Sequence, residues 1–334
     1  MSLTNVGVGA AETAGLDVPV AADKNIHGRS PTQIAFDRLR KDKVAVVSFV
    51  LVVFFVLVAV FAPLLTRAFG VEVDGGDPSE DLDIFAFPII GPPDNAFTWD
   101  APLGLAPSSG DDNLAEWFYG ARTSLEVAAA ATIGSTVLGI VIGLVAGFSR
   151  GWLDRIITFV IDVFLSFPFL LGALALAPIL VNRFATDAAA LDKAQFLSLV
   201  LILTFFGWMY LARLIRGEVL SLREREFIQA ARAIGVPTRA ILFKELLPNL
   251  VAPIVVSISL GLPAYVTAEA GLAYLGIGLT GRPSWGQTIT RAAPFFDSYA
   301  LYLWAPVVGI MVLVVALNLL GDSVRDAFDP KTRR

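Results

Sequence analysis

The chain has 334 residues, of which 56% are hydrophobic, 16% are charged and none is cysteine, and its formal net charge is −5. A soluble domain of this length could not bury so many apolar side chains in one core, so long apolar runs between short charged stretches indicate a membrane protein. The lack of cysteine excludes disulfides and thiolate metal sites, and the single histidine, His27, excludes most zinc chemistry and histidine-based acid–base catalysis.

The N-terminal segment is polar and irregular. Residues 1–30 are rich in Gly, Ala, Val and Asp without periodicity, which predicts a disordered cytoplasmic tail. A signal peptide would begin with basic residues and an apolar run, whereas the first apolar run here begins at Val44. The segment 31–43 is basic, and we interpret it as a short cytoplasmic helix before that run.

Six apolar runs follow, and each has about twenty residues or more, enough to cross a hydrocarbon core of about 30 Å. Glycine and proline within the runs are typical of packed or kinked membrane helices, with a moving hinge as the alternative. We predict an all-α polytopic membrane protein with about six transmembrane helices, a first helix at 44–65, a five-helix core over 125–320 and a cytoplasmic tail at 321–334. The runs cover roughly 44–65, 125–148, 156–181, 196–215, 250–277 and 301–320.

The charges along the chain are asymmetric. Lysine and arginine gather in 31–43 and in the loop between the fourth and fifth runs, whereas the segment 66–124 has many carboxylates and only Arg67 and Arg122 as cations. Because cytoplasmic loops carry the excess of basic residues, we predict that both termini are cytoplasmic and that 66–124 is an acidic extracytoplasmic loop. Its Pro, Gly and Asp clusters predict turns. The loop is either a docking surface for an external partner or a solvated segment.

The loop 218–248 carries a helical pattern. Apolar residues recur there at helical spacing, at Phe227, Ala230, Ala231 and Ile234. Gly235 is expected to end this helix, because glycine readily adopts the left-handed conformation of a C-cap.

A second helix is expected directly afterwards. Pro237 suits its first turn, where a missing N–H costs nothing, and Pro248 is expected to stop it before the fifth span. The prediction is therefore a cytoplasmic helix–turn–helix with an arginine-rich rim. Periodicity alone leaves open a helix that lies on the bilayer surface.

The stretch from Gln229 to Asn249 resembles the "EAA" loop of importer-type ABC permeases. That loop has an acidic-Ala-Ala triplet, a glycine four residues after the second alanine, and a Leu-Pro near its end. Ala230, Ala231, Gly235 and Pro248 match, whereas Gln229 stands where many members have glutamate. The resemblance implies that the loop docks into a groove on an ATPase subunit.

A second block extends the resemblance. The chain reads AEAGLAYLGIGLTGRPSWGQTITRA from Ala268 and ALNLLGDSVRDAFDP from Ala316 to Pro330, and this part resembles the C-type dipeptide/oligopeptide/nickel permeases. The basic segment 31–43 and Tyr119-Gly-Ala-Arg-Thr-Ser-Leu also match. The chain departs from the family where 103–106 reads LGLA and 110–112 reads GDD, in place of the usual Gly-Thr-Asp and Gly-Arg-Asp.

This resemblance implies a multi-pass permease of the cytoplasmic (inner) membrane that works by alternating access. Its implied partners are a homologous B-type permease subunit, one or two ABC ATPase subunits, an extracytoplasmic substrate-binding protein and membrane lipid, with no nucleic acid. The implied substrate is a di- or oligopeptide, and nickel complexes, glutathione or sugars stay open. An ATP-independent channel or secondary transporter is the alternative outside this family.

The chain itself is not expected to be an enzyme or to hold a metal or cofactor. A phosphate-binding loop needs glycines before Lys-Ser/Thr, and the only lysine followed by serine or threonine is Lys331, after Pro330. ATP and Mg would therefore be used by partner subunits.

The deepest ionisable residues within the apolar runs are Asp162 and Glu269. A charge inside a bilayer costs about 3 kcal/mol even on the lenient insertion scale, so such residues are functional candidates. For Glu269 we favour a structural or gating network, with contact to substrate or an interfacial position as alternatives.

Overall fold

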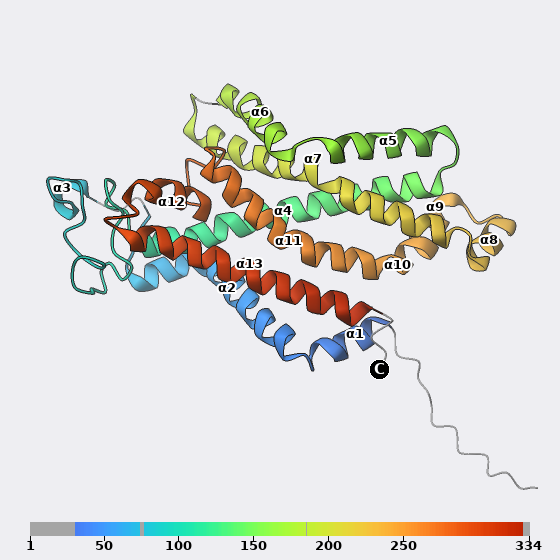
Figure 1. The fold of residues 1–334 in the computed structure, drawn as a ribbon, viewed down its shortest axis with the longest axis horizontal. Coiled ribbons are helices and arrows are strands. Elements are labelled where there is room, and N and C mark those ends of the chain that lie inside the picture. The colour runs from blue at the N-terminus through green and yellow to red at the C-terminus, as the bar shows by residue number, and fades with distance from the viewer. Residues whose placement is uncertain (1–30, 74–76, 185, 330–334) are drawn as a thin grey trace, which may run out of the picture.

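The computed structural model describes residues 31–73, 77–184 and 186–329. These residues form a bundle of long helices with turns between them, and the only β-structure among them is two isolated bridges (Figure 1). The prediction of an all-α protein is confirmed. The predicted tail 1–30 and the last residues of the predicted tail 321–334 lie outside the described residues.

Five helices are long and apolar enough to cross a membrane, or six if one bent pair counts as a single span, as predicted. Each follows one of the apolar runs in the sequence. They are α2 (Lys43–Phe69), α4 (Asn113–Phe148), α7 (Ala188–Leu222), α11 (Val251–Tyr274) and α13 (Ala300–Phe328).

The third apolar run is not one straight helix. It divides into α5 (Trp152–Ser166) and α6 (Phe169–Val181), which meet at an angle of 91°. Pro168 causes the break, because a proline disfavours helical backbone at the residue before it, and Phe167 is extended with φ −81° and ψ 132°. The run 156–181 is therefore either one broken span or a re-entrant pair of helices, and not one straight helix.

Four of these helices, α2, α4, α7 and α13, extend beyond the apolar runs that predicted them. α4 begins at Asn113, inside the predicted loop 66–124, and α13 continues to Phe328, inside the predicted tail 321–334. Hydropathy marks only strongly apolar turns, whereas the first turns of α4 carry Glu116, whose carboxylate is buried against Arg291 at 2.6 Å. This ion pair joins α4 to the short helix α12 (Trp285–Ala292).

The predicted helix at 31–43 is shorter than expected, since α1 (Pro31–Leu39) ends before Asp42 caps α2. α1 packs on the end of α13, where Arg38 Nη1 donates to the carbonyl oxygens of Ala327 (3.2 Å) and Asp329 (3.3 Å). Both ends of the described chain therefore lie at one end of the bundle (Figure 1).

The described parts of residues 70–112 fold as a compact cap at the opposite end of the bundle (Figure 1). The cap contains the single turn α3 (Pro78–Asp81) and packs on α13, because Tyr299 Oη donates to the carbonyl oxygen of Pro92 at 3.0 Å. At its end Asp112 caps α4 by accepting from the N–H groups of Leu114 and Ala115, and burial raises the pKa of Asp112 to about 6.

The most extensive helix contact in the bundle is between α4 and α7. Three glycines on α4 lie four residues apart and face larger side chains of α7, so that the two backbones approach closely. A Cβ atom on Gly143 would lie 2.7 Å from Ile215 Cβ and 2.8 Å from the carbonyl oxygen of Ala212. The facing sets are Gly139, Gly143 and Gly147 on α4, and Leu211, Ile215 and Val219 on α7.

We expect Gly143→Ala to destabilise the protein, because an added methyl group in a packed contact typically costs about 1–3 kcal/mol. The matched control is Gly217→Ala on α7, where a Cβ atom meets nothing within 4 Å and alanine favours a helix by up to about 1 kcal/mol. Thermal unfolding in detergent should show a lower midpoint for the first variant and an equal or higher one for the second. Equal midpoints for both would contradict the packing described.

Candidate functional site

The loop singled out in the sequence lies at the end of the bundle opposite the cap (Figure 1). It follows α7 and contains α8 (Glu226–Ala233) and α9 (Thr238–Ala240). A π-helical turn at Ile241–Leu246 and the short α10 (Leu247–Asn249) then lead into α11.

Gly235 ends α8 as predicted. Its φ of +81° is left-handed, its N–H donates to the Arg232 carbonyl at 3.1 Å, and the N–H of Val236 donates to the Ala231 carbonyl at 3.0 Å. This pair of bonds is the Schellman motif, which fixes the direction of the chain as it leaves a helix. Pro237 differs slightly from the prediction, since it is the residue before α9 rather than part of its first turn.

The loop packs through a residue that the sequence pattern did not single out. Ile228 is fully buried with Ile241, Leu246 and Leu250 and with side chains of α4 and α7. Ile234 is 80% exposed and Phe227 is 42% exposed. Helical spacing therefore predicted the helix but not which side of it packs, and α8 presents apolar side chains outward.

Two arginines hold the loop against the end of α4. Arg223 Nη1 donates to the carbonyl oxygens of Gly147 (3.0 Å) and Ser149 (3.3 Å), which would otherwise lack partners at a helix end. The guanidinium of Arg232 lies 4.5 Å from the centre of the Phe148 ring, within the range of a cation–π contact. The loop is thus a braced projection and not a free segment.

Pro248 does not stop the helix before the fifth span, contrary to the prediction. It lies in the first turn of α10, a position that proline's fixed φ suits. The preceding turn is π-helical, with the N–H of Leu247 bonded to the Leu242 carbonyl. Helical backbone therefore continues almost without interruption from α9 into α11.

The other predicted loop residues are distributed over both sides of α8. Gln229 is exposed, and its Nε2 donates to the Glu224 carbonyl at 3.1 Å, so this side chain helps to close the turn before α8. Ala230 is exposed, and Ala231 is partly buried against the apolar cluster under the loop. The exposed small residue leaves room for another backbone to approach.

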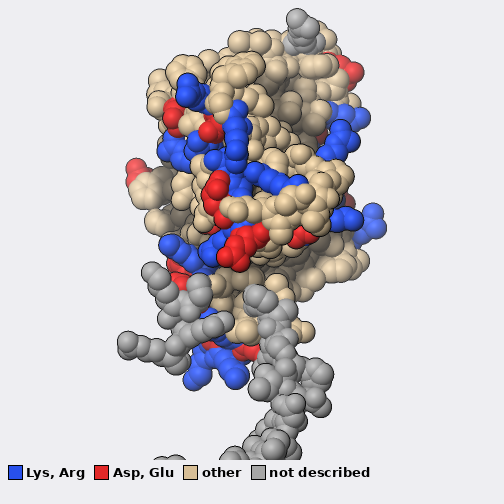
Figure 2. Space-filling model, turned by 90° about the vertical axis from the view of Figure 1, so that its right-hand side faces the viewer, with Lys and Arg blue, Asp and Glu red and all other residues tan. Residues whose placement is uncertain are grey.

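A basic surface surrounds the loop. Figure 2 views this end of the bundle and shows lysine and arginine side chains spread across it, with fewer carboxylates between them. The described cations of the loop region are Arg213, Arg216, Arg223, Arg225, Arg232, Arg239 and Lys244.

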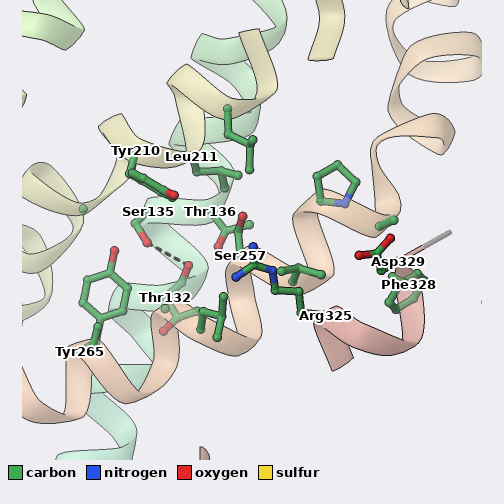
Figure 3. A pocket seen from close by; sticks show the side chains of 18 residues that line it. Thr132, Ser135, Thr136, Tyr210, Leu211, Ser257, Tyr265, Arg325, Phe328 and Asp329 are labelled. Atoms are coloured by element: carbon green, nitrogen blue, oxygen red, sulfur yellow. Dashed lines mark hydrogen bonds between the residues drawn. The ribbon is translucent and has the colours of Figure 1, made fainter. Parts of the chain in front are cut away.

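The second feature is a cavity of about 690 Å³ between α4, α7, α11 and the end of α13 (Figure 3). Hydroxyl groups line it between apolar side chains. In Figure 3, Tyr265 lies at one side, and Arg325, Phe328 and Asp329 lie at the other. The labelled hydroxyl residues are Thr132, Ser135, Thr136, Tyr210, Ser257 and Tyr265.

Two of the hydroxyl groups on α4 donate to their own helix. Thr132 Oγ1 donates to the Ala128 carbonyl at 2.7 Å, and Ser135 Oγ donates to the Thr132 carbonyl at 3.1 Å. Each oxygen keeps its lone pairs, so the wall offers hydrogen-bond acceptors without charge. Such a surface can solvate the N–H groups of a polar molecule without holding an ion tightly.

Sequence reasoning missed this cavity. A signal was present, because the hydroxyl residues Thr132, Ser135 and Thr136 recur at i, i+3 and i+4 within an apolar run and so share one helix face. The other walls come from α7 and α11, where Gly207 allows the Tyr265 side chain to approach. A Cβ atom on Gly207 would lie 1.9 Å from Tyr265 Oη.

The two predicted ionisable residues belong to neither feature. Asp162 on α5 is ion-paired with Arg213 on α7, and both side chains are about half exposed, at 54% and 56%. Glu269 on α11 is fully buried. The structure does not bring the two together, and the burial of Glu269 favours the structural role over contact with substrate.

Residues 139–334 match the sequence profile of the family described as "Binding-protein-dependent transport system inner membrane component". Residues 30–75 match the profile of the "N-terminal TM domain of oligopeptide transport permease C". Together the two profiles cover α1, α2 and the chain from the last turns of α4 onward.

Individual relatives are similar over nearly the whole chain. The dipeptide transport system permease protein DppC of Alkalihalophilus pseudofirmus is 35% identical over 91% of this chain and 91% of its own length. The oligopeptide transport system permease protein OppC of Bacillus subtilis is 29% identical over 89% and 88%. The glutathione transport system permease protein GsiD of Pectobacterium atrosepticum is 29% identical over 95% and 96%.

We expect Arg223→Gln to loosen the loop, because hydrogen bonds from a charged donor contribute about 1.5–3 kcal/mol. Amide hydrogen exchange over 226–246 should become at least about tenfold faster, since each 1.4 kcal/mol corresponds to a factor of 10. The control is Arg225→Gln, an exposed neighbour for which no side-chain bond occurs among the described residues. Unchanged exchange in Arg223→Gln would mean that apolar packing alone holds the loop.

Proposed function

The chain belongs to the family of binding-protein-dependent transport system inner membrane components, and on that premise we propose that it is the permease subunit of an ABC importer for di- or oligopeptides. The names of its relatives support the peptide substrate, because relatives at 35% and 29% identity are named as dipeptide and oligopeptide transport permeases. Glutathione is itself a small peptide, so the relative that transports it is consistent with this substrate class. Nickel complexes and sugars are the alternative cargo.

We infer that the end of the bundle with α8 faces the cytoplasm and that the cap lies outside. The basic surface around the loop supports this orientation, since lysine and arginine are retained on the cytoplasmic side (Figure 2). The cap supports it from the other end, because no lysine or arginine occurs between Arg67 and Arg122. Both termini would then be cytoplasmic.

The main support for ATPase docking at the loop 218–248 is an apolar side chain that a rigid loop holds exposed to solvent. Ile234 is 80% exposed on a projection fixed by Arg223 and by the Schellman motif at Gly235. An exposed apolar side chain on a rigid support is typical of a contact that another protein covers. We propose that an ABC ATPase subunit, which would bind and hydrolyse ATP with Mg, docks here.

The cavity supports a transport role for the bundle. It is lined by uncharged hydroxyl groups along α4, α7 and α11, and its size of about 690 Å³ suits a short peptide. We propose that a homologous permease subunit closes its open side and that an extracytoplasmic binding protein delivers the substrate. Motion of the docked ATPases would then open the path alternately to each side of the membrane.

We expect Gly235→Glu to abolish ATP-driven uptake in proteoliposomes and to release the ATPase subunit on purification. A Cβ atom there meets nothing within 4 Å, so insertion in the membrane should be intact, and the new charge would point into the docking surface. A non-glycine residue in the left-handed conformation adds roughly 1–2 kcal/mol of strain.

Gly276→Glu is the matched control, because Gly276 ends α11 with the same bonding pattern, a φ of +86° and nothing within 4 Å of a Cβ atom. It carries the same strain at the other end of the bundle, so it should retain the ATPase subunit. Equal loss of that subunit in both variants would point to strain and would contradict docking at Gly235.

The cavity is tested with single cysteines, since the chain has none of its own. Ser257→Cys on the cavity wall should react with a membrane-impermeant thiol reagent at least about tenfold faster than Val56→Cys, which lies near the middle of α2 and is 43% exposed on the bundle surface. A thiol must ionise to react, and hydrocarbon prevents ionisation. Equal rates at the two positions would mean that the cavity is not open to water.

A further inference from the structure

The cap holds two large apolar side chains in water at the tip of one turn. Ile84 is 93% exposed and Phe85 is 73% exposed. Burying one such side chain completely stabilises a protein or a complex by about 1.5–3 kcal/mol. The fold of the cap does not gain this stabilisation from either side chain, so a bound partner could. Exposed apolar side chains that are adjacent in this way are typical of an interaction surface.

The turn that carries them is fixed by its own hydrogen bonds. Asp83 Oδ1 accepts from the N–H groups of Phe85 (2.9 Å) and Phe87 (2.8 Å), and the backbone N–H of Asp83 donates to the Phe87 carbonyl at 2.7 Å. Ala86 takes a left-handed φ of 62° to close the turn. The Phe87 ring packs edge-on against Phe295 with 6.2 Å between centres, which anchors the turn to the bundle.

Because the turn is rigid before any partner arrives, little conformational entropy would be lost when the two side chains are buried by another molecule. This distinguishes the tip from a mobile loop that happens to contain apolar residues. The sequence left two interpretations of the acidic segment open, and the geometry of this tip favours the docking surface over the solvated loop.

The charge around the tip limits what can bind there. The cap contains no lysine, arginine or histidine, and Glu80, Asp81 and Asp83 come directly before the tip in the sequence. A surface of this kind attracts a basic partner and is repelled by anionic lipid headgroups, which argues against insertion of the tip in a bilayer. The described carboxylates of the cap before α4 are Glu72, Asp77, Glu80, Asp81, Asp83, Asp94 and Asp100, together with Asp111 and Asp112.

We propose that Ile84 and Phe85 form a docking anchor for the extracytoplasmic substrate-binding protein, which would receive them in an apolar pocket with a basic rim. The proposal rests on the proposed function, since it takes the cap to be extracytoplasmic and a binding protein to be the partner. Two kinds of residue would contribute to binding in different ways. The two apolar side chains hold the complex, and the carboxylates steer its formation.

This division predicts two kinetic signatures. Loss of a buried apolar anchor acts mainly on the dissociation rate, whereas loss of a charge at the rim acts mainly on the association rate and its dependence on salt. The complete transporter in phosphatidylcholine nanodiscs, with the purified binding protein of the same transport system as the analyte, allows both rates to be measured by surface plasmon resonance.

Phe85→Ser should raise the Kd at least about tenfold, mainly through faster dissociation, with little change in thermal stability because the side chain is exposed. Glu80→Gln combined with Asp94→Asn should slow association and flatten its dependence on salt. The matched control is Trp152→Ser, which removes an equally exposed apolar side chain at the start of α5, at the opposite end, and should leave the affinity for the binding protein unchanged.

Two results would overturn the proposal. One is a Phe85→Ser transporter that binds the binding protein with wild-type rates. The other is a bilayer contact, tested with a fluorophore on Phe85→Cys as the only cysteine of this chain, whose emission would shift to the blue in lipid nanodiscs without binding protein. If the wild-type transporter neither binds the binding protein nor takes up peptide with ATP, the proposed function itself fails together with this proposal.

Discussion

The close contact between α4 and α7 is the constraint on which the other features depend. α4 has glycines at this contact, so side chains of α7 fill the space beside them. The two backbones therefore run close together through the bundle. These helices supply two walls of the cavity, and their ends supply the apolar cluster on which Ile228 of the loop packs. Separating them would therefore disturb the cavity and the loop together.

The two ends of the molecule share one feature, an exposed apolar side chain on a turn fixed by hydrogen bonds. At each end a short turn holds an isoleucine in water, Ile84 in the cap and Ile234 in the loop. A carboxylate that accepts two N–H groups fixes the first turn, and a left-handed glycine fixes the second. The surrounding charge differs in sign, so each end would select a different class of partner.

The sequence was sufficient where local chemistry decides and insufficient where distant segments meet. Apolar runs predicted the spans, and Gly235 predicted the end of α8, because both follow from neighbouring residues. The early start of α4 could not be predicted, since burial of Glu116 requires Arg291 from a remote helix. Pro168 indicated a kink, but hydropathy does not show by how much a helix bends there. The cavity could not be predicted because its walls come from three helices that are far apart in the sequence. The docking role of the loop stays a prediction.

The π-helical turn at Ile241–Leu246 has a mechanical consequence. α4 and α7 are joined to the loop by Arg223 and by apolar packing, so a force on the loop would move these two walls as one rigid lever. α11 is connected to the same loop through a π-helical turn, which has more residues per turn than an α-helix and is frequently found at functional sites. A displacement of the loop would therefore rotate α11 about its own axis, so that this wall of the cavity turns relative to α4 and α7.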